Sequence, residues 1–202
     1  MFQAQVPHKL SIAFDHVRMA ILLTAVGGDV KSIHLLVMAA TDIISAYAAE
    51  TGAELSVDID AHIKPESRKV WFKAKKRAYN FFKHADLDPT AEYDGPDAEK
   101  LAWLNDAGLI QAITNLRGLG LQLTPSMQWF WRAALVLMPQ IIVWDEMPEA
   151  KIEFDKMVDQ YGFSRTDMLQ MILAGVIKSG DVVVDDIASI STVAASLPDL
   201  TG

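Results

Sequence analysis

"KSIHLLVMAATDIISAYAAE", residues 31–50, is apolar on nearly every side when it is placed on a helix, above all between Ile33 and Ile44. A helix on the surface of a bundle keeps one polar face, so this one is expected at the centre of its bundle or at a contact between subunits. Asp29 is predicted to cap the start of the helix, and Gly52 is predicted to follow its end.

Helical periodicity extends to both sides of this segment, with apolar residues three and four apart and with proline or capping residues at the predicted starts. "ELSVDIDAHI", residues 54–63, is expected to be a connection rather than a strand. The tail from residue 181 is expected either to form a last short helix or to remain unpacked. The predicted helices span about residues 9–26, 29–50, 65–85, 98–116, 125–144 with a bend at Pro139, 149–160 and 166–178.

The predicted fold class is therefore all-α, a helical bundle of about six to seven helices. The long helices lie in the first two thirds of the chain and the shorter ones at the C-terminal end. A chain of 202 residues, of which 51% are hydrophobic, suits one domain with a sizeable core. We expect a single all-α domain over residues 1–202, with a core bundle at about 8–145 and a C-terminal helical appendage at about 146–202.

Composition excludes several classes of protein. The chain has no cysteine, which removes disulfides and thiolate chemistry and suits a reducing compartment, so a cytoplasmic location is expected. The start of the chain is too polar for a secretory signal. The longest apolar block, residues 133–144, is too short to cross a bilayer, so no membrane association is expected. A net charge of −8 argues against a generally basic nucleic-acid binder.

The basic residues are nevertheless concentrated in one segment. Between Lys64 and Lys83 the chain carries eight lysines and arginines against the single acid Glu66, a local charge of +7 that leaves −15 for the rest of the chain. Six acidic residues follow at once, between Asp86 and Glu99. This pattern predicts either a solvated helix face beside an acidic loop or a local anion-binding surface.

The candidate site lies in "RAYNFFKHADLDP", residues 77–89. Arg77, Asn80 and His84 are three and four residues apart, so they share one stripe of about 10 Å at the end of a predicted helix. A histidine exchanges a proton near neutral pH, an arginine binds phosphate with two hydrogen bonds, and an asparagine orients either group. The stripe fits metal-independent RNA cleavage, with His84 as acid or base. It also fits an ordinary basic helix end, where the helix dipole favours an imidazole.

"RAYNFFKH", residues 77–84, resembles the signature of the HEPN (higher eukaryotes and prokaryotes nucleotide-binding) families, an arginine followed after four to six residues by a histidine on a late helix of an α-helical bundle. Six residues separate Arg77 from His84. The resemblance implies a domain that usually dimerises, so that two motifs meet in a cleft. It also implies an RNase or, in other members, a protein that only binds.

The same resemblance implies that Arg77 and His84 are catalytic residues, and Asn80, on the same stripe, is predicted to be catalytic with them. Many active members carry a polar residue directly after the arginine, where this chain has Ala78, and this leaves the role of Asn80 open. "NFFKHADLDP", residues 80–89, is also similar to the N-F-F-K-H-A-D-x-D-P motif of an uncharacterised bacterial family. Three lysines of the basic segment are predicted to bind the substrate: Lys73, Lys76 and Lys83.

A second polar stripe runs along the apolar helix, where His34, Thr41 and Ser45 are seven and eleven residues apart. Buried polar groups need hydrogen-bond partners, and the stripe of Arg77 is one source of them. If the two stripes face each other, they form either a shielded site or an internal polar network. For His34 alone, a hydrogen-bonded core histidine is the simpler interpretation.

No cofactor and no bound metal are expected. His34 and His84 with Asp86 or Asp88 form the nearest metal-ligand set, but the Glu-x-x-His pairs of helical di-metal sites do not occur. Trp129, Phe130 and Trp131 cannot all face one side of a helix, so a homodimer is expected. Two hypotheses stay open. The chain is an RNase-like enzyme or an RNA- or nucleotide-binding protein, or it is a non-catalytic helical interaction protein whose polar stripe is structural.

Overall fold

The computed structural model describes residues 7–58, 65–84, 87, 89–137, 152, 155–156 and 165–179. These residues form six helices and no strand, which confirms the predicted all-α fold. The helices are α1 (His8–Ala25), α2 (Val30–Thr51), α4 (Pro65–Lys83), α5 (Ala98–Gly118), α6 (Pro125–Leu137) and α8 (Arg165–Ser179). The ends of α1, α2, α4, α5 and α8 lie within a few residues of the predicted ones, and α6 starts as predicted and is described to Leu137.

Contacts along the chain divide it into two compact units, Met1–Leu123 and Thr124–Gly202. The helix α6 belongs to the second unit. Two local features of the chain lie at the boundary between the units. Gly120 has a φ of 85°, which favours glycine, and the Thr124 hydroxyl accepts the Met127 N–H at the start of α6.

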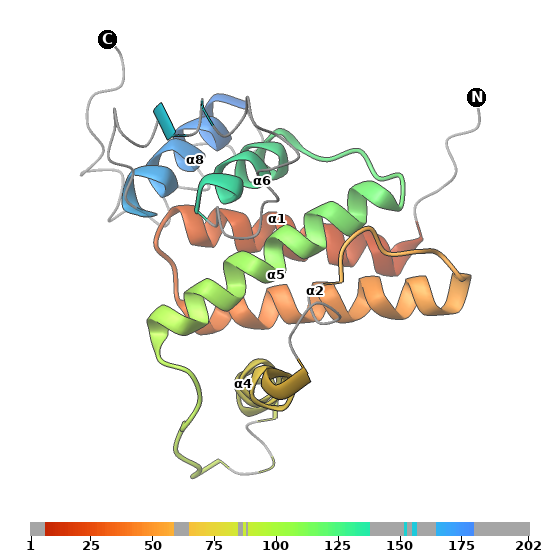
Figure 1. The fold of residues 1–202 in the computed structure, drawn as a ribbon, viewed down its shortest axis with the longest axis vertical. Helices are drawn as coiled ribbons and strands as arrows, with labels where there is room; N and C mark the ends of the chain where they lie inside the picture. The colour runs from red at the N-terminus through yellow and green to blue at the C-terminus, as the bar shows by residue number, and fades with distance from the viewer. Residues whose placement is uncertain are drawn as a thin grey trace. The chain divides into compact units, whose positions relative to one another are not determined.

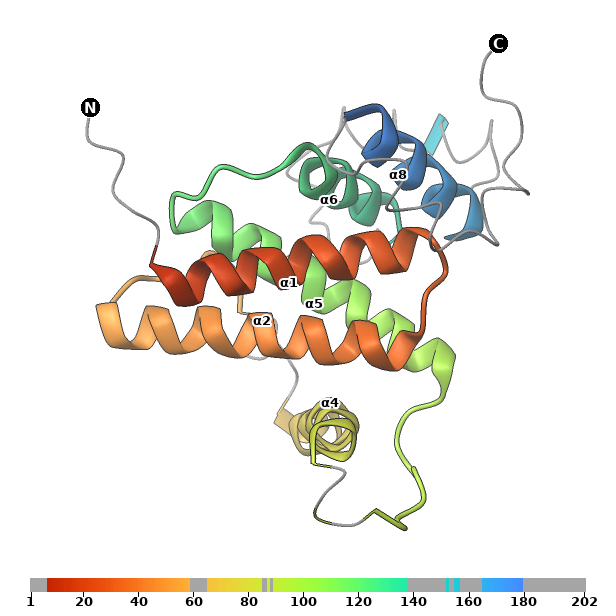
Figure 2. The ribbon, with the colours of Figure 1, turned by 180° about the vertical axis from the view of Figure 1, so that it is seen from behind.

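The first unit is built around α2, which contacts α1, α4 and α5. In Figures 1 and 2, α1 runs beside α2, α5 crosses them, and α4 is seen end-on at the side of α2 away from α1. The predicted central place of α2 is therefore confirmed within this unit. By length and composition α2 is also the one described helix that could span a membrane. Its packing against three helices accounts for its apolar surface.

Both predicted ends of α2 are observed. The Asp29 carboxylate accepts the Ser32 N–H at 2.8 Å, and Gly52 ends the helix with a φ of 69°. The connection after α2 is held by a side chain from α5. Asn115 Nδ2 donates to the Val57 carbonyl at 2.8 Å, while Asn115 Oδ1 accepts the Val57 N–H at 2.9 Å. Val57 thus satisfies its backbone groups through a side chain, and residues 53–58 form no strand, as expected.

In the second unit α6 packs against α8. Phe130 is fully buried, whereas Trp129 is 40% exposed and lies over Gly175, where an added Cβ would come within 2.9 Å of the indole ring. The aromatic residues of α6 thus divide between the core and the surface, as their spacing predicted. The predicted bend at Pro139, Trp144, the tail from residue 181 and most of the predicted helix at 149–160 lie outside the described residues.

The close packing of α2 on α5 depends on Gly108. A Cβ added at this glycine would lie 2.5 Å from the Val37 Cγ1 atom, and Val37 is 1% exposed. A β-branched side chain in a packed core has no room to turn away.

Replacing Gly108 by alanine should therefore destabilise the protein by about 1–3 kcal/mol through overpacking, although alanine favours a helix by about 1 kcal/mol. Urea unfolding followed by circular dichroism measures the change. In a Val37→Ala background, where the space is open, Gly108→Ala should lower the free energy of unfolding by much less. Equal costs in the two backgrounds would contradict the role given to Gly108.

Candidate functional site

The position of α4 is set by a buried histidine of α2. His34 is 1% exposed, and its Nδ1 lies 2.7 Å from Asn105 Oδ1 on α5. Its Nε2 lies 3.2 Å from the main-chain oxygen of Lys75 on α4. Asn105 Nδ2 in turn donates to the Val30 carbonyl at 2.9 Å, which orients the amide so that its oxygen faces the ring. One imidazole therefore joins α2, α4 and α5.

Both groups that face this ring are oxygens that accept hydrogen bonds. A neutral imidazole has one N–H and donates to one of them at a time, and the shorter contact favours donation from Nδ1 to Asn105. Burial lowers the pKa of His34 below its ordinary value, and the hydrogen bonds to Asn105 and to the Lys75 carbonyl offset this only in part. The imidazole is therefore a structural link, and its neutral form is the one that the core favours.

The structure does not bring the His34 stripe to the Arg77 stripe. His34 takes its partners from Asn105 and from the backbone of Lys75. The Thr41 hydroxyl donates to the Met38 carbonyl of its own helix, and Ser45 is exposed. The two predicted stripes thus do not form one shielded site, because the carbonyl of α4 and the amide of α5 already satisfy the histidine.

The face of α4 that points away from the core carries four exposed lysines, which we call the lysine stripe: Lys69, Lys73, Lys76 and Lys83. Their spacing of four, three and seven residues places them on one side of the helix, over about 21 Å of its length. The buried residues of α4 are Lys75, Ala78 and Tyr79. The three lysines predicted to bind a substrate therefore belong to one accessible surface.

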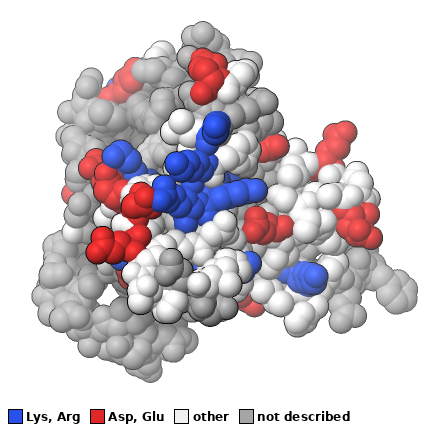
Figure 3. Space-filling view, turned by 90° about the horizontal axis from the view of Figure 1, so that it is seen from below, with Lys and Arg blue, Asp and Glu red and all other residues white. Residues whose placement is uncertain are grey.

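The lysine stripe forms a cluster of positive charge on a protein of net charge −8. Figure 3 shows lysine and arginine side chains gathered in the middle of this face, with acidic groups at the margin. Lys83 Nζ lies 5.1 Å from the centre of the Tyr79 ring, and Lys76 Nζ lies 6.0 Å from that of Phe72. Among the residues that the structure describes, no carboxylate lies within ion-pair distance of the four ammonium groups.

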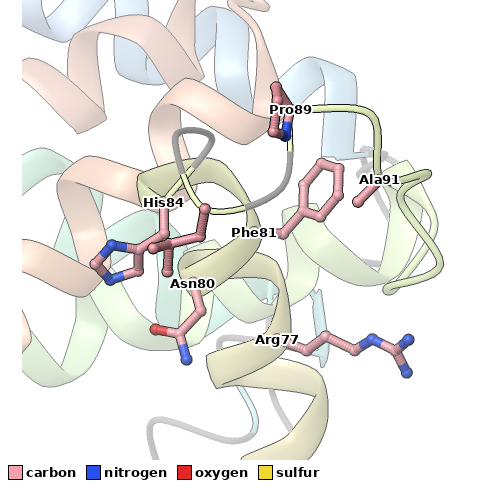
Figure 4. Close-up of a pocket in the computed structure, with 7 residues that line it drawn as sticks. Arg77, Asn80, Phe81, His84, Pro89 and Ala91 are labelled. Carbon is pink, nitrogen blue, oxygen red and sulfur yellow. The ribbon is translucent and has the colours of Figure 1, made fainter.

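At the C-terminal end of α4 the predicted catalytic residues are exposed, as their stripe requires. The helix ends at Lys83, and the His84 N–H still donates to the Asn80 carbonyl at 3.0 Å. Arg77 Nη2 donates to Asp94 Oδ2 in an ion pair, with the side chains 41% and 63% exposed. In Figure 4 the guanidinium and the His84 imidazole extend to opposite sides, with Asn80 between them. Within one chain they do not meet at one point.

Three aromatic rings hold the loop after α4 against the helix end. The Tyr93 ring lies 5.2 Å from that of Phe81 and 5.0 Å from that of Phe82. Lys31 Nζ, from the start of α2, lies 5.9 Å from both the Phe82 and the Tyr93 ring centres. The Tyr93 hydroxyl donates to the Pro96 carbonyl at 3.0 Å. This aromatic cluster of Phe81, Phe82 and Tyr93 fixes the loop that carries Asp94.

Between this loop and the helix end lies an open pocket of about 620 Å³ (Figure 4). One part of its lining is apolar and comes from both the helix and the loop. The other part is polar and comes from the predicted catalytic stripe. The apolar residues are Phe81, Leu87, Pro89 and Ala91, and the polar ones are Arg77, Asn80 and His84.

Metal chemistry gains no support from the described part of the chain, where no three histidine, aspartate or glutamate side chains gather in a way that could hold an ion. Asp86 and Asp88, from the metal-ligand set considered above, lie outside the described residues. Sequence reasoning also missed two residues of the site, Tyr93 and Asn105. An aromatic residue in an acidic, proline-containing loop and an asparagine inside an apolar helix are the signals that could have found them.

The chain matches no model of a known protein family, no curated protein and no solved structure. The residues themselves therefore carry the argument for a function.

The histidine link predicts how stability depends on pH. Because folding lowers the pKa of His34, its contribution to stability is complete above the unfolded pKa of about 6.5 and is lost as the pH falls through the lower folded value. His34→Leu leaves the Asn105 oxygen without its donor and should cost about 1–3 kcal/mol at pH 7.5.

The same variant no longer titrates at this position, so the difference in stability between it and the wild type should narrow between pH 7.5 and pH 5. Urea unfolding at a series of pH values measures both quantities. A difference that stays constant or widens toward pH 5 would contradict this account.

Proposed function

We propose that this protein binds RNA through the exposed face of α4, with phosphates on the lysine stripe and with Arg77, Asn80 and His84 at one end of the bound strand. The observation that carries the proposal is the lysine stripe itself. Four exposed ammonium groups lie in line on the side of the helix that points away from the core, within a segment of charge +7. A linear array of cations on an acidic protein is suited to a linear polyanion.

The rest of the chain limits where such a polymer could lie. Outside residues 64–83 the protein carries a charge of −15, which repels a nucleic acid. Binding would therefore be confined to α4 and its immediate surroundings. The likeness of "RAYNFFKH" to the HEPN signature supports RNA as the polyanion.

Binding, rather than cleavage, is the activity that the geometry of one chain supports. Cleavage would need the guanidinium and the imidazole at a single phosphate, whereas Arg77 is paired with Asp94 and points away from His84. An exposed ion pair of this kind is worth only about 0–1 kcal/mol, so Arg77 can exchange Asp94 for a phosphate without a large loss of stability. The three residues then act as ligands for the strand.

The second hypothesis, a non-catalytic interaction protein with a structural polar stripe, gains support from one observation. His34 is buried, and each of its ring nitrogens lies within hydrogen-bond distance of an acceptor in the core, which is typical of a structural histidine. This concerns α2 alone and leaves the exposed face of α4 unexplained. The two hypotheses differ in whether removing lysines from the lysine stripe weakens RNA binding more than removing lysines elsewhere.

Replacing Lys73 and Lys76 by glutamine should weaken RNA binding by on the order of 10-fold at 0.1 M salt. It should also lower the slope of log K against log salt by about 1.4, because each phosphate contact on a single strand contributes about 0.7. Fluorescence anisotropy with a labelled RNA over a salt series measures both quantities.

The matched control is Lys9→Gln/Lys178→Gln, which changes the net charge equally at two exposed lysines outside α4. It should leave both the affinity and the slope close to those of the wild type. Equal losses in the two double variants would mean that only net charge matters and would rule out a binding face on α4.

Bound RNA should remain intact, because one chain does not bring Arg77 and His84 to the same phosphate. Incubation of end-labelled RNAs with the wild type and with His84→Ala, followed by gel electrophoresis, checks this. Cleavage by the wild type that His84→Ala abolishes would contradict it. That result would mean that the guanidinium leaves Asp94 or comes from a second copy.

A further inference from the structure

We propose that the pocket at the C-terminal end of α4 receives one unpaired nucleobase, so that the RNA bound by this protein is single-stranded. This deepens the proposed function and rests on it. The pocket has a volume of about 620 Å³ and opens at the end of the lysine stripe. A strand whose phosphates follow Lys73, Lys76 and Lys83 would bring its next nucleotide to the pocket.

The pocket has an apolar part that suits the flat face of a base and a polar part that suits its hydrogen-bonding edge. Phe81 offers an aromatic ring, and Leu87 and Pro89 add apolar surface from the loop. A base that stacks on an aromatic side chain needs no particular sequence, because every base has a π-face. Asn80 and His84 carry the donors and acceptors that the hydrogen-bonding edge of a base requires.

The wall that would meet the base is held in place before anything binds. Phe81 packs against both Phe82 and Tyr93, with ring centres 5.8 Å and 5.2 Å away. Phe82 in turn lies edge-on to the buried His34 ring at 6.5 Å. The stacking surface is thus connected to the core of the first unit, and a bound base would not have to order it.

A double helix cannot use this pocket. Its bases are stacked and paired, and the major groove of A-form RNA is too deep and narrow for side chains to reach them. Flipping a base out of a duplex costs a few kcal/mol, which an unpaired strand does not lose. The lysine stripe alone binds either form, so the pocket is what would distinguish them.

Leu87 gives the cleanest variant because it is 76% exposed and can be changed with little effect on the core. Val70, 71% exposed on α4 and absent from the pocket lining, is its matched control. The probes are a short labelled RNA without self-pairing and the duplex that it forms with its complement. Anisotropy measures the affinity of each protein for both probes.

The wild type should bind the single strand about 10-fold more tightly than the duplex. Phe81→Leu, which removes the ring, should weaken single-strand binding by on the order of 10-fold and leave duplex binding unchanged. Leu87→Ser should act in the same direction by a smaller factor, and Val70→Ser should change neither affinity.

Equal affinity of the wild type for the two probes would overturn the inference. So would single-strand binding that neither Phe81→Leu nor Leu87→Ser weakens. If Lys73→Gln/Lys76→Gln still weakens RNA binding in those cases, the proposed binding face on α4 is retained and only the inference of a base in the pocket is rejected. Absence of binding to both probes would remove the proposed function and this inference together.

Discussion

The hydrogen bonds of one buried imidazole hold the first unit in its arrangement. His34 lies on the apolar helix α2, and its ring nitrogens face Asn105 of α5 and the backbone of α4. Without such partners a buried imidazole would cost several kcal/mol, so the three helices are favoured in one relative position. The contact with α4 is to a main-chain carbonyl, so it does not depend on which side chain stands at position 75.

In this arrangement α4 has two distinct faces. One face buries Ala78, the other presents the lysine stripe, and Tyr79 lies at the border, beside Lys83. The aromatic cluster then closes the end of the helix by docking the loop that carries Tyr93 and Asp94. The exposed lysine stripe, the pocket at the end of α4 and the position of the loop all depend on how the basic helix α4 packs on the apolar helix α2.

Much of this fold could be predicted because helix formation is local. Periodicity identified the helices, and the ends of α2 followed from an aspartate that caps the first turn and a glycine with positive φ. The shared face of Arg77, Asn80 and His84 could also be predicted, since turn counting places residues on a face, but their exposure could not. Turn counting does not say where a side chain ends, and Arg77 extends to an aspartate 17 residues further along the chain.

Partners that lie far apart in sequence were beyond such reasoning. Asn105 is 71 residues from His34, and nothing in the spacing of either helix pairs them. The division of the contacts into two units was also beyond such reasoning, for a related reason. The apolar pattern of α6 predicts that it packs, but the pattern is the same whether it packs on the helices before it or on those after it.

The ion pair between Arg77 and Asp94 gives the site a built-in competitor. Asp94 is anchored by the aromatic ring beside it, so its carboxylate stays close to the guanidinium and acts as a tethered anion of high effective concentration. A free phosphate, chloride or mononucleotide must displace it with a single contact. In the proposed complex, a polymer already held by several lysines would deliver its phosphate under the same intramolecular advantage, which a small free anion lacks.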